Sequence, residues 1–262
     1  MKIIAHRGNS SVYPENTLEA YRSAIELGAD MIETDIWLTK DGVPVMLHDG
    51  NLNRTGKHDR HVADMTFEEV RRIKVNYTDK FGDKYKSCLV PSVEEVLVLC
   101  RDTGAHVCLE LKTIAAAGPV KDLIDKTGFR EEDAIILVWT NDNVKEAYKY
   151  FKRAPIYHLA PLGDYKKAED KDEYFKEVRK IGLRGLDVNA YELFGMPEEE
   201  VKRYVFLAKK YGMPIVVWTV DDEATMNKAF NYRVKGRACD AGISGITTNV
   251  PSLCMEVRAK QP

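Results

Sequence analysis

The sequence predicts a closed (β/α)8 barrel, also called a TIM barrel, in a single domain spanning residues 1–262. The chain has 262 residues, 44% of them hydrophobic, and no break in composition, which suits one large core. Helical patterns alternate with short apolar segments that indicate buried parallel strands. Eight such segments begin at residues 3, 31, 106, 134, 156, 185, 214 and 242. Eight βα units close into a barrel with its active site at the C-terminal strand ends.

The first two units show how each element is identified. Residues 3–6 form an apolar run that stops at Gly8, as a buried strand does before a loop. Residues 16–27 have the pattern of an amphipathic helix, with Asn16 as its N-cap. The strand at 31–38 continues through the turn residues 40–42 into a second strand at 43–47, which predicts a hairpin.

Residues 51–91 interrupt the alternation and predict a small insertion after the second strand. They contain a polar loop, a helix that begins with the capping-box pair Thr66 and Glu69, and an aromatic-rich loop at 77–85. The regular pattern resumes with a helix capped by Ser92 and Glu95. The later strands are expected at 106–112, 134–139, 156–159, 185–189, 214–220 and 242–248, and the clearest helix at 198–210.

Composition excludes several classes of partner. The formal net charge of -2 gives no basic field for nucleic acid, and no apolar run reaches the roughly 20 residues that a membrane span requires.

The five cysteines are odd in number and scattered, so we expect small buried side chains in a reducing compartment. Because Met1 directly precedes the first strand, we expect a cytoplasmic protein without stable membrane association. The sequence does not indicate an oligomeric state.

Three carboxylates at strand ends predict a metal site. Glu33 and Asp35 are two residues apart in a strand, so both point to one face, where their charges repel. A divalent cation removes that conflict, and Glu110 at the end of the third strand supplies another ligand. Hard oxygen ligands without thiolates favour Mg²⁺ or Ca²⁺ over zinc. For any one of these acids alone, an ion pair is the ordinary explanation.

Four basic side chains reach the same rim and indicate chemistry on a phosphodiester. Arg7 offers paired donors to phosphate and Lys112 a compact positive charge. His6, at the end of the first strand, and His48, at the end of the hairpin, can serve as base and acid. A single histidine is more often structural, and the convergence of all these residues is what predicts an active site. The histidines in the segment 58–61 are expected in a solvated turn.

These residues carry a resemblance to a known family. The segments H-R-G, P-E-N-T, I-E-T-D, D-G-V-P-V-M-L-H-D, L-N-R-T, V-P-S-V-E-E-V-L, L-E-L-K and V-V-W-T-V resemble, in this order, the glycerophosphodiester phosphodiesterase family over nearly the whole chain. The resemblance implies a (β/α)8 barrel with a small insertion after the second strand. It also implies that His6 and His48 are the acid/base pair. By the same resemblance, Glu33, Asp35 and Glu110 are the metal ligands, and Arg7 and Lys112 contact the phosphate.

The resemblance further implies a substrate and a reaction course. The glycerol 2-hydroxyl of a small glycerophosphodiester attacks phosphorus, and water then opens the cyclic phosphate to give sn-glycerol 3-phosphate and an alcohol. Two alternatives remain open. One is another enzymatic activity, phospholipase D-like or lysophospholipase D-like, and the other is a non-catalytic barrel that binds phosphorylated ligands.

Two positions depart from the family pattern. Trp139-Thr140 stands where the family commonly has Ser-Phe, and Thr248-Asn249 where it has Thr-Asp. Both changes are expected to reshape the pocket for the alcohol. Trp218, near the end of the seventh strand, either packs against glycerol carbons or is a core residue of the rim. Glu15 and Asn16 are expected only to shape the first loop and cap its helix.

Overall fold

A closed ring of parallel strands forms the centre of the molecule. The computed structural model describes residues 1–234 and 240–261. The ring runs in the order β1-β13-β10-β9-β8-β7-β6-β2, and β1 pairs back with β2, which closes it and confirms the (β/α)8 barrel. The strands are β1 (Lys2–His6), β2 (Met31–Leu38), β6 (His106–Leu111), β7 (Ala134–Val138), β8 (Ile156–Leu159), β9 (Leu183–Asn189), β10 (Ile215–Trp218) and β13 (Gly245–Thr248).

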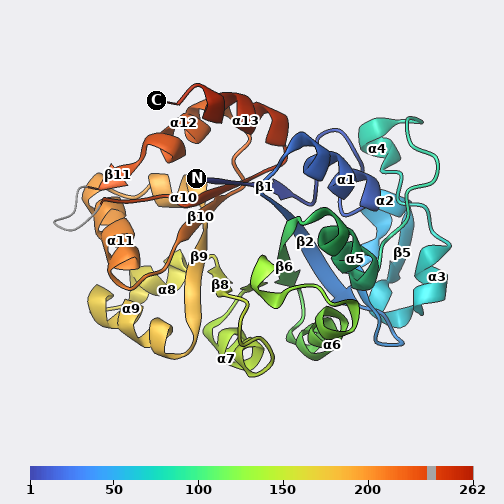
Figure 1. Cartoon of the computed structure of the whole chain (residues 1–262), viewed down its shortest axis with the longest axis horizontal. Helices are drawn as coiled ribbons and strands as arrows, with labels where there is room; N and C mark the ends of the chain where they lie inside the picture. Colours follow the sequence, from blue (N-terminus) through green and yellow to red (C-terminus); the bar gives the residue numbers. More distant parts are fainter. Residues whose placement is uncertain (235–239, 262) are drawn as a thin grey trace.

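Amphipathic helices surround the strands and bury their apolar faces against them (Figure 1). Several have the caps that their sequences predict: Ser92 and Glu95 form a capping box at α5, and Gly28 ends α1 in the left-handed conformation. The helices are α1 (Leu18–Leu27), α5 (Val93–Thr103), α6 (Ala117–Thr127), α7 (Asn141–Tyr150), α8 (Leu162–Lys167), α9 (Lys171–Lys180), α10 (Ala190–Phe194), α11 (Glu198–Lys210), α12 (Glu223–Asn231) and α13 (Pro251–Ala259), with the 3-10 turns η2 (Ile114–Ala116) and η3 (Glu131–Asp133).

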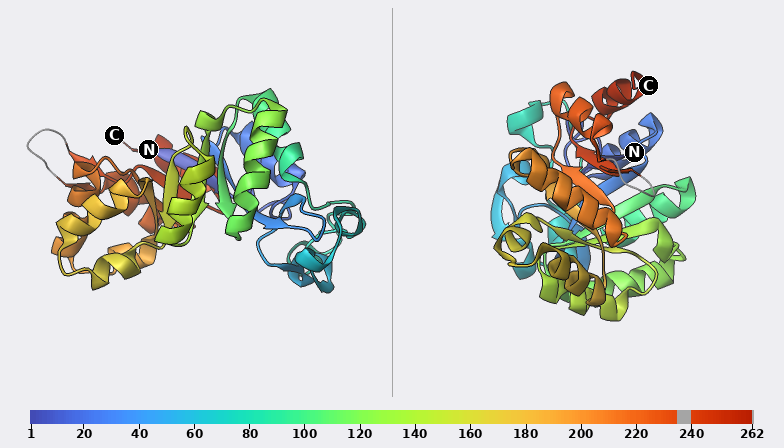
Figure 2. Two further views of the ribbon diagram at one scale, coloured as in Figure 1. Left: turned by 90° about the horizontal axis from the view of Figure 1, so that it is seen from below. Right: turned by 90° about the vertical axis from the view of Figure 1, so that its left-hand side faces the viewer.

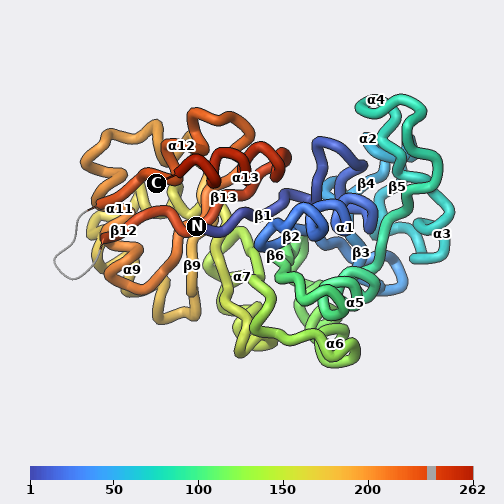
Figure 3. Tube along the Cα trace, turned by 45° about the horizontal axis from the view of Figure 1, so that its top comes forward, coloured from blue at the N-terminus to red at the C-terminus, as the bar shows by residue number. Residues whose placement is uncertain are grey.

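The predicted hairpin and the excursion after it are both present. Strand β3 (Pro44–Met46) pairs antiparallel with β2. Residues 51–91 then form β4 (Asn51–Leu52), α2 (Asn53–Gly56), β5 (His58–His61), η1 (Val62–Asp64), α3 (Phe67–Arg71) and α4 (Thr78–Phe81). They gather at one end of the molecule (Figures 1 and 3, and the left view of Figure 2) and pack around a small apolar cluster that includes Leu52, Val62 and Val70 and also Val45 of β3.

A buried apolar layer fills the barrel between its two ends. It consists of Ile4, Met31, Cys108, Leu137, Tyr157, Leu159 and Val216. Gly185 is necessary for this packing, because a Cβ atom there would lie 2.3 Å from the Tyr157 ring. The space that a side chain would take on β9 is therefore filled by the aromatic ring of β8. This layer separates the C-terminal rim from the opposite end of the barrel.

Three local predictions are wrong. Thr17, not Asn16, is the N-cap of α1, because Asn16 has φ 56° and its amide binds Asp35 instead. The last barrel strand begins at Gly245, since residue 242 belongs to β12 (Ala241–Gly242), which pairs antiparallel with β11 (Arg233–Val234). The segment His58–His61 is the strand β5 paired with β4, and not a turn. In each case a tertiary partner decides the local structure.

Four cysteines, Cys88, Cys100, Cys108 and Cys254, are buried and free, as predicted. Cys239 lies outside the described residues. Within the part of the chain that the structure describes, no helix has both the length and the apolar character needed to cross a membrane.

Candidate active site

Three buried carboxylates meet at the C-terminal ends of adjacent strands. Glu33 and Asp35 come from β2 and Glu110 from β6, and the register places Asp35 opposite Glu110. One oxygen of each residue lies within 4.8 Å of one oxygen of the others, and the residues are only 2%, 0% and 6% exposed. This geometry can hold a metal ion.

The triad carries more negative charge than its protein neighbours neutralise. Burial, and then the charges of Asp35 and Glu110, hold the pKa of Glu33 well above its usual range. Burial and Asp35 also raise the pKa of Glu110. Burial would raise the pKa of Asp35 too, but Arg7 and Lys112 outweigh it and lower that pKa. Glu33 Oε1 is buried and has no hydrogen-bond partner within the described ranges. A divalent cation fits both the charge and the unpaired oxygen.

Arg7 and Lys112 lie against the triad. Arg7 Nε is 3.0 Å from Asp35 Oδ2, and Lys112 Nζ is 2.9 Å from Asp35 Oδ1 and also contacts Glu110. Arg7 follows β1 with φ 58°, and its backbone N–H donates to Glu33 Oε2 at 3.0 Å. Gly8 completes the turn, because it has φ 81° and a Cβ there would lie 2.6 Å from the backbone of Ala20 in α1. The H-R-G motif therefore holds Arg7 at the carboxylates.

His6 is held by an amide at the far end of the chain. Its Nδ1 lies 2.8 Å from Asn249 Oδ1. Asn249 Nδ2 donates to Asp221 Oδ2 at 2.7 Å, so its amide oxygen is the atom that faces the imidazole. His6 Nδ1 therefore donates its hydrogen, and Nε2, 3.8 Å from Glu33 Oε2, carries the lone pair. Burial, and then Arg7, lower the pKa of His6 to about 4, which keeps the ring neutral at pH 7.

His48 follows β3 and lies in the same pocket. Its Nδ1 donates to Asp49 Oδ1 at 2.8 Å, and Asp49 Oδ2 accepts from Arg54 Nε at 2.8 Å. The two histidines thus have different partners: an amide oxygen for His6 and a carboxylate for His48. Each partner fixes the orientation of its ring.

Glu15 connects the insertion to the site. Arg54, in α2, donates to both oxygens of Glu15 at 2.7 and 2.9 Å, and Arg7 Nη1 donates to Glu15 Oε1 at 2.8 Å. Asn16 beside it donates to Asp35 at 2.8 Å and accepts from Tyr21. Both residues therefore do more than the loop-shaping and capping that we expected. Arg54 and Asp35, which Glu15 and Asn16 contact, are distant in sequence. In the sequence, only the P-E-N-T segment itself could have indicated the roles of Glu15 and Asn16.

Aromatic side chains form another wall of the pocket. Trp139 Nε1 donates to Glu110 Oε1 at 2.8 Å, and its ring lies edge-on to Trp218 with centroids 6.4 Å apart. The cavity has a volume of about 110 Å³. Its lining contains His6, Arg7, Glu33, His48, Glu110, Lys112, Leu137, Trp139, Leu159, Asp187, Trp218, Thr219 and Thr247. The structure therefore brings together all the predicted site residues, with Asp35 just behind the lining.

Sequence reasoning missed Asp187. The pattern at 185–189 predicts a strand but assigns no role to the acid within it. Asp187 is 4% exposed and lines the cavity, and its Oδ1 is buried without a hydrogen-bond partner in the described residues. The available signal was an acid flanked by Leu186 and Val188 and placed in the C-terminal half of a strand.

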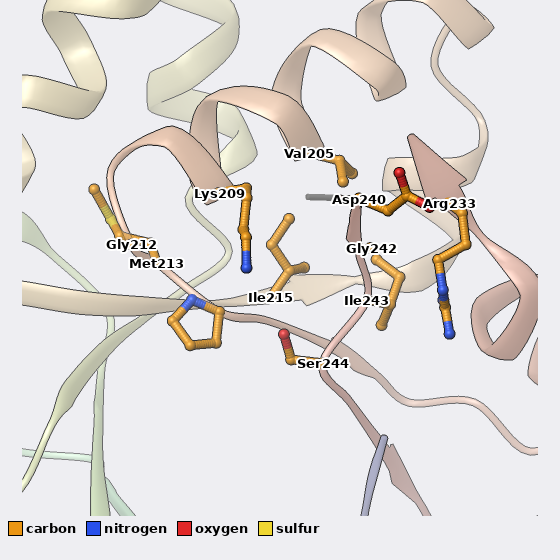
Figure 4. Close-up of a pocket in the computed structure, with 11 residues that line it drawn as sticks. Val205, Lys209, Gly212, Met213, Ile215, Arg233, Asp240, Gly242, Ile243 and Ser244 are labelled. Atoms are coloured by element: carbon orange, nitrogen blue, oxygen red, sulfur yellow. The ribbon is translucent and has the colours of Figure 1, made fainter. Parts of the chain in front are cut away.

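A larger hollow of about 520 Å³ lies at the other end of the barrel (Figure 4). Its lining includes Met213, Pro214 and Ser244, which precede β10 and β13. Since it contains none of the predicted site residues, the smaller cavity at the C-terminal rim is the candidate active site.

Comparison with known proteins gives consistent matches over nearly the whole chain. Residues 6–253 match the model of the glycerophosphoryl diester phosphodiesterase family. A glycerophosphodiester phosphodiesterase of Caldanaerobacter subterraneus subsp. tengcongensis is 31% identical over 98% of both chains. The crystal structure of a glycerophosphodiester phosphodiesterase from Thermotoga maritima is 26% identical, with a TM-score of 0.76 over 98% of this chain and 97% of that one. An Oleispira antarctica phosphodiesterase in complex with the product sn-glycerol-3-phosphate has a TM-score of 0.79 at 20% identity, over 99% and 97% of the chains.

Proposed function

Because the chain belongs to the glycerophosphoryl diester phosphodiesterase family and is a phosphoric diester hydrolase, we propose that it hydrolyses glycerophosphodiesters to sn-glycerol 3-phosphate and an alcohol. The observation that carries this proposal is the buried carboxylate triad, with two cationic side chains and two histidines around one small cavity. The product bound to the Oleispira antarctica phosphodiesterase supports the same substrate class. We further propose that residues 1–262 form one domain, with residues 51–91 inserted in it.

Glu33, Asp35 and Glu110 would hold one divalent cation, Mg²⁺ or Ca²⁺. Three carboxylates without a thiolate favour these hard ions, and the unpaired oxygen of Glu33 supports a bound cation. When bound, the cation polarises a phosphoryl oxygen and the attacking hydroxyl.

Arg7 and Lys112 would bind the phosphate. Both already face the triad through Asp35, so they are oriented before the substrate arrives. The guanidinium group can donate two parallel hydrogen bonds to phosphate oxygens, and the ammonium group adds a point charge. Together they stabilise the additional negative charge that develops on the phosphoryl oxygens in the transition state.

We assign His6 as the base and His48 as the acid of the first step. His6 Nε2 has a free lone pair, because Asn249 accepts the hydrogen on Nδ1. It accepts the proton of the glycerol 2-hydroxyl as that oxygen bonds to phosphorus, and His48 donates a proton to the departing alcohol oxygen. The internal attack gains an effective molarity of roughly 10⁵ to 10⁸ M. Water then opens the cyclic phosphate with the two roles reversed.

A substrate panel tests the proposal. The purified chain is incubated with glycerophosphocholine, glycerophosphoethanolamine or glycerophosphoglycerol, with Mg²⁺ or Ca²⁺, and released sn-glycerol 3-phosphate is measured. We expect release with a cation, loss of release with a chelator, and recovery when excess cation is added. Absence of sn-glycerol 3-phosphate from all three substrates with both cations would contradict the proposal.

A further inference from the structure

The wall of the cavity opposite the carboxylate triad contains a buried acid that the proposed reaction does not use. Asp187 lies on β9, and β9 is four strands from β2 in either direction around the ring. Its neighbours in the register are Leu159 on β8 and Val216 on β10, both apolar. The acid therefore lies across the barrel from Glu33 and Asp35, between apolar neighbours on both adjacent strands.

The Asp187 carboxyl group lies in the cavity wall and has no hydrogen-bond partner among the described residues. The residue is 4% exposed, and its Oδ1 is buried and makes no hydrogen bond within the described chain. Trp218 Nε1, on the neighbouring strand β10, is also buried and unpaired, and Trp218 lines the same cavity. Buried polar groups without partners are costly, and sites that bind polar ligands are where they persist.

We propose that Asp187 is a specificity-determining residue that binds the terminal hydroxyl group of the glycerol moiety of the substrate. The inference rests on the proposed function. In the proposed reaction the glycerol 2-hydroxyl lies at the carboxylate triad and phosphorus lies between Arg7 and Lys112. The third glycerol carbon then extends away from the triad, toward the opposite wall. Its hydroxyl is the substrate group that can reach β9.

The size and walls of the cavity indicate which part of the substrate lies at its inner end, beside Asp187. They favour the glycerol moiety there and not the variable alcohol. A cavity of about 110 Å³ has room for a three-carbon polyol. Leu137 and Leu159 offer apolar contacts to the carbon atoms, while Asp187 and the Trp218 N–H offer partners to a hydroxyl. The alcohol then lies toward the exposed mouth, where Trp139 is 42% exposed.

The partner of Asp187 is a hydroxyl group and not an ammonium group. A hydroxyl group can both donate a hydrogen bond to the Asp187 carboxyl group and accept one from it, whereas the trimethylammonium group of choline has no hydrogen to donate. The geometry of the wall supports the same conclusion, because the acid lies at the inner end and not at the mouth.

The experiment compares substrates that differ only at the terminal hydroxyl. sn-Glycero-3-phosphocholine is compared with an analogue that has hydrogen in place of this hydroxyl and with lysophosphatidylcholine, in which it is acylated. All three retain the attacking 2-hydroxyl. We expect kcat/KM of the unsubstituted enzyme to be about 100-fold or more higher for sn-glycero-3-phosphocholine than for the deoxy analogue, because a site built around a hydroxyl rejects the analogue that lacks it.

Asp187→Val should remove this discrimination. We expect kcat/KM for sn-glycero-3-phosphocholine to fall to the level of the deoxy analogue, with the rate for the analogue changed by only a few-fold. Asp187→Asn should retain part of the discrimination, since an amide both donates and accepts. The melting temperature of Asp187→Val should be equal to or above that of the parent, because an unpaired buried acid is lost. If this variant fails to fold, Asp187→Ala gives the same comparison.

Glu131→Gln is the matched control. Glu131 is also a buried acid, 2% exposed, but it accepts hydrogen bonds from the backbone N–H groups of Arg153 and Ala154, outside the cavity. This variant should lower the melting temperature and leave the ratio of kcat/KM between the two substrates unchanged.

Four outcomes would overturn the inference. The first two concern the parent enzyme: equal rates on sn-glycero-3-phosphocholine and its deoxy analogue, and efficient hydrolysis of lysophosphatidylcholine. The other two concern Asp187→Val: an equal loss of the rates on sn-glycero-3-phosphocholine and the deoxy analogue, and an effect on choline esters but not on glycerophosphoglycerol. In each of these cases hydrolysis of glycerophosphodiesters still stands. A parent enzyme that hydrolyses none of the substrates would instead overturn the proposed function, and this inference with it.

Discussion

The two halves of the barrel rim are built from different kinds of side chain. The half formed by β1, β2 and β6 carries charged groups that pair with one another, as Arg7, Asp35 and Lys112 do. The rest of the rim, formed by β7 to β10 and β13, lines the cavity with tryptophan, leucine and threonine side chains and, among the described residues, a single acid, Asp187. We call these the charged half and the aromatic half. We propose that the reaction chemistry lies in the charged half, while the aromatic half determines which substrate fits.

The largest expected effect is on turnover and lies in the charged half. His6→Ala and His48→Ala should each lower kcat by about 10² to 10⁴, since each removes a proton-transfer group. Cation affinity should be retained, because neither residue belongs to the carboxylate triad. Steady-state kinetics and calorimetric cation titration measure the two properties. Turnover retained in either variant would reject the catalytic role of that histidine.

The next effect concerns the proposed cation. Removing a side chain that hydrogen-bonds a metal ligand typically lowers metal affinity 10- to 100-fold. Glu110→Gln removes the charge of a ligand itself, so cation affinity should fall by about 100-fold or more. The melting temperature of the cation-free protein should change little, because the acids already repel one another. Calorimetric titration with Mg²⁺ and Ca²⁺ checks this, and unchanged affinity for both would refute Glu110 as a ligand.

Trp139 tests whether the two halves act separately. It belongs to the aromatic half but donates a hydrogen bond of 2.8 Å to Glu110. Trp139→Phe keeps an aromatic ring and removes the donor, so cation affinity should fall by about 10-fold. The same titration measures the change. An effect confined to the choice of substrate, with no change in cation affinity, would show that the halves are independent.

The smallest expected effect is on stability. Burial would raise the pKa of Glu15, but hydrogen bonds from Arg54 and the charges of Arg7 and Arg54 outweigh it, so this pKa is lowered. A lowered carboxyl pKa stabilises the fold above the pKa of the unfolded chain, and this stability is lost as pH falls through the folded pKa. Glu15→Gln should therefore cost about 1 kcal/mol at pH 7.

Urea unfolding at several pH values measures this difference. The free energies of unfolding of parent and variant should converge as the pH falls below the ordinary glutamate range. A difference that stays constant down to the lowest pH at which both fold would mean that the carboxylate charge is not responsible. Lys149→Ala, at an exposed ion pair of α7, is a control that should change stability little.

How well the sequence predicted the site differs between the halves. Glu33, Asp35 and Glu110 follow from strand periodicity and from the rule that parallel strands end at one rim. The contact between Asn249 and His6 could not be found in this way, and Asp187 has only the weaker signal of a single acid near a strand end. Asn249 meets His6 across 243 positions of sequence, through closure of the barrel, and Asp187 has no charged neighbour in the chain that would mark it.

Local structure was predictable where local groups decide it. The capping boxes of α3 and α5 formed as their sequences indicate, because all the partners lie within three residues. Asn16 was assigned wrongly because its amide binds Asp35, a partner 19 residues away. The prediction of a barrel strand beginning at residue 242 was wrong for a similar reason. Residue 242 pairs with β11, which is not part of the barrel.

The ring of Tyr157 over Gly185 has a kinetic consequence. With the layer around it, this ring fills the barrel beneath the cavity, so among the described residues the mouth at the C-terminal rim is the entrance. Substrate and both products must share that entrance. In the binding mode proposed for the glycerol moiety, the alcohol lies nearer the entrance and leaves first, and sn-glycerol 3-phosphate leaves last. Release is then ordered, and accumulated sn-glycerol 3-phosphate competes with fresh substrate for the empty enzyme.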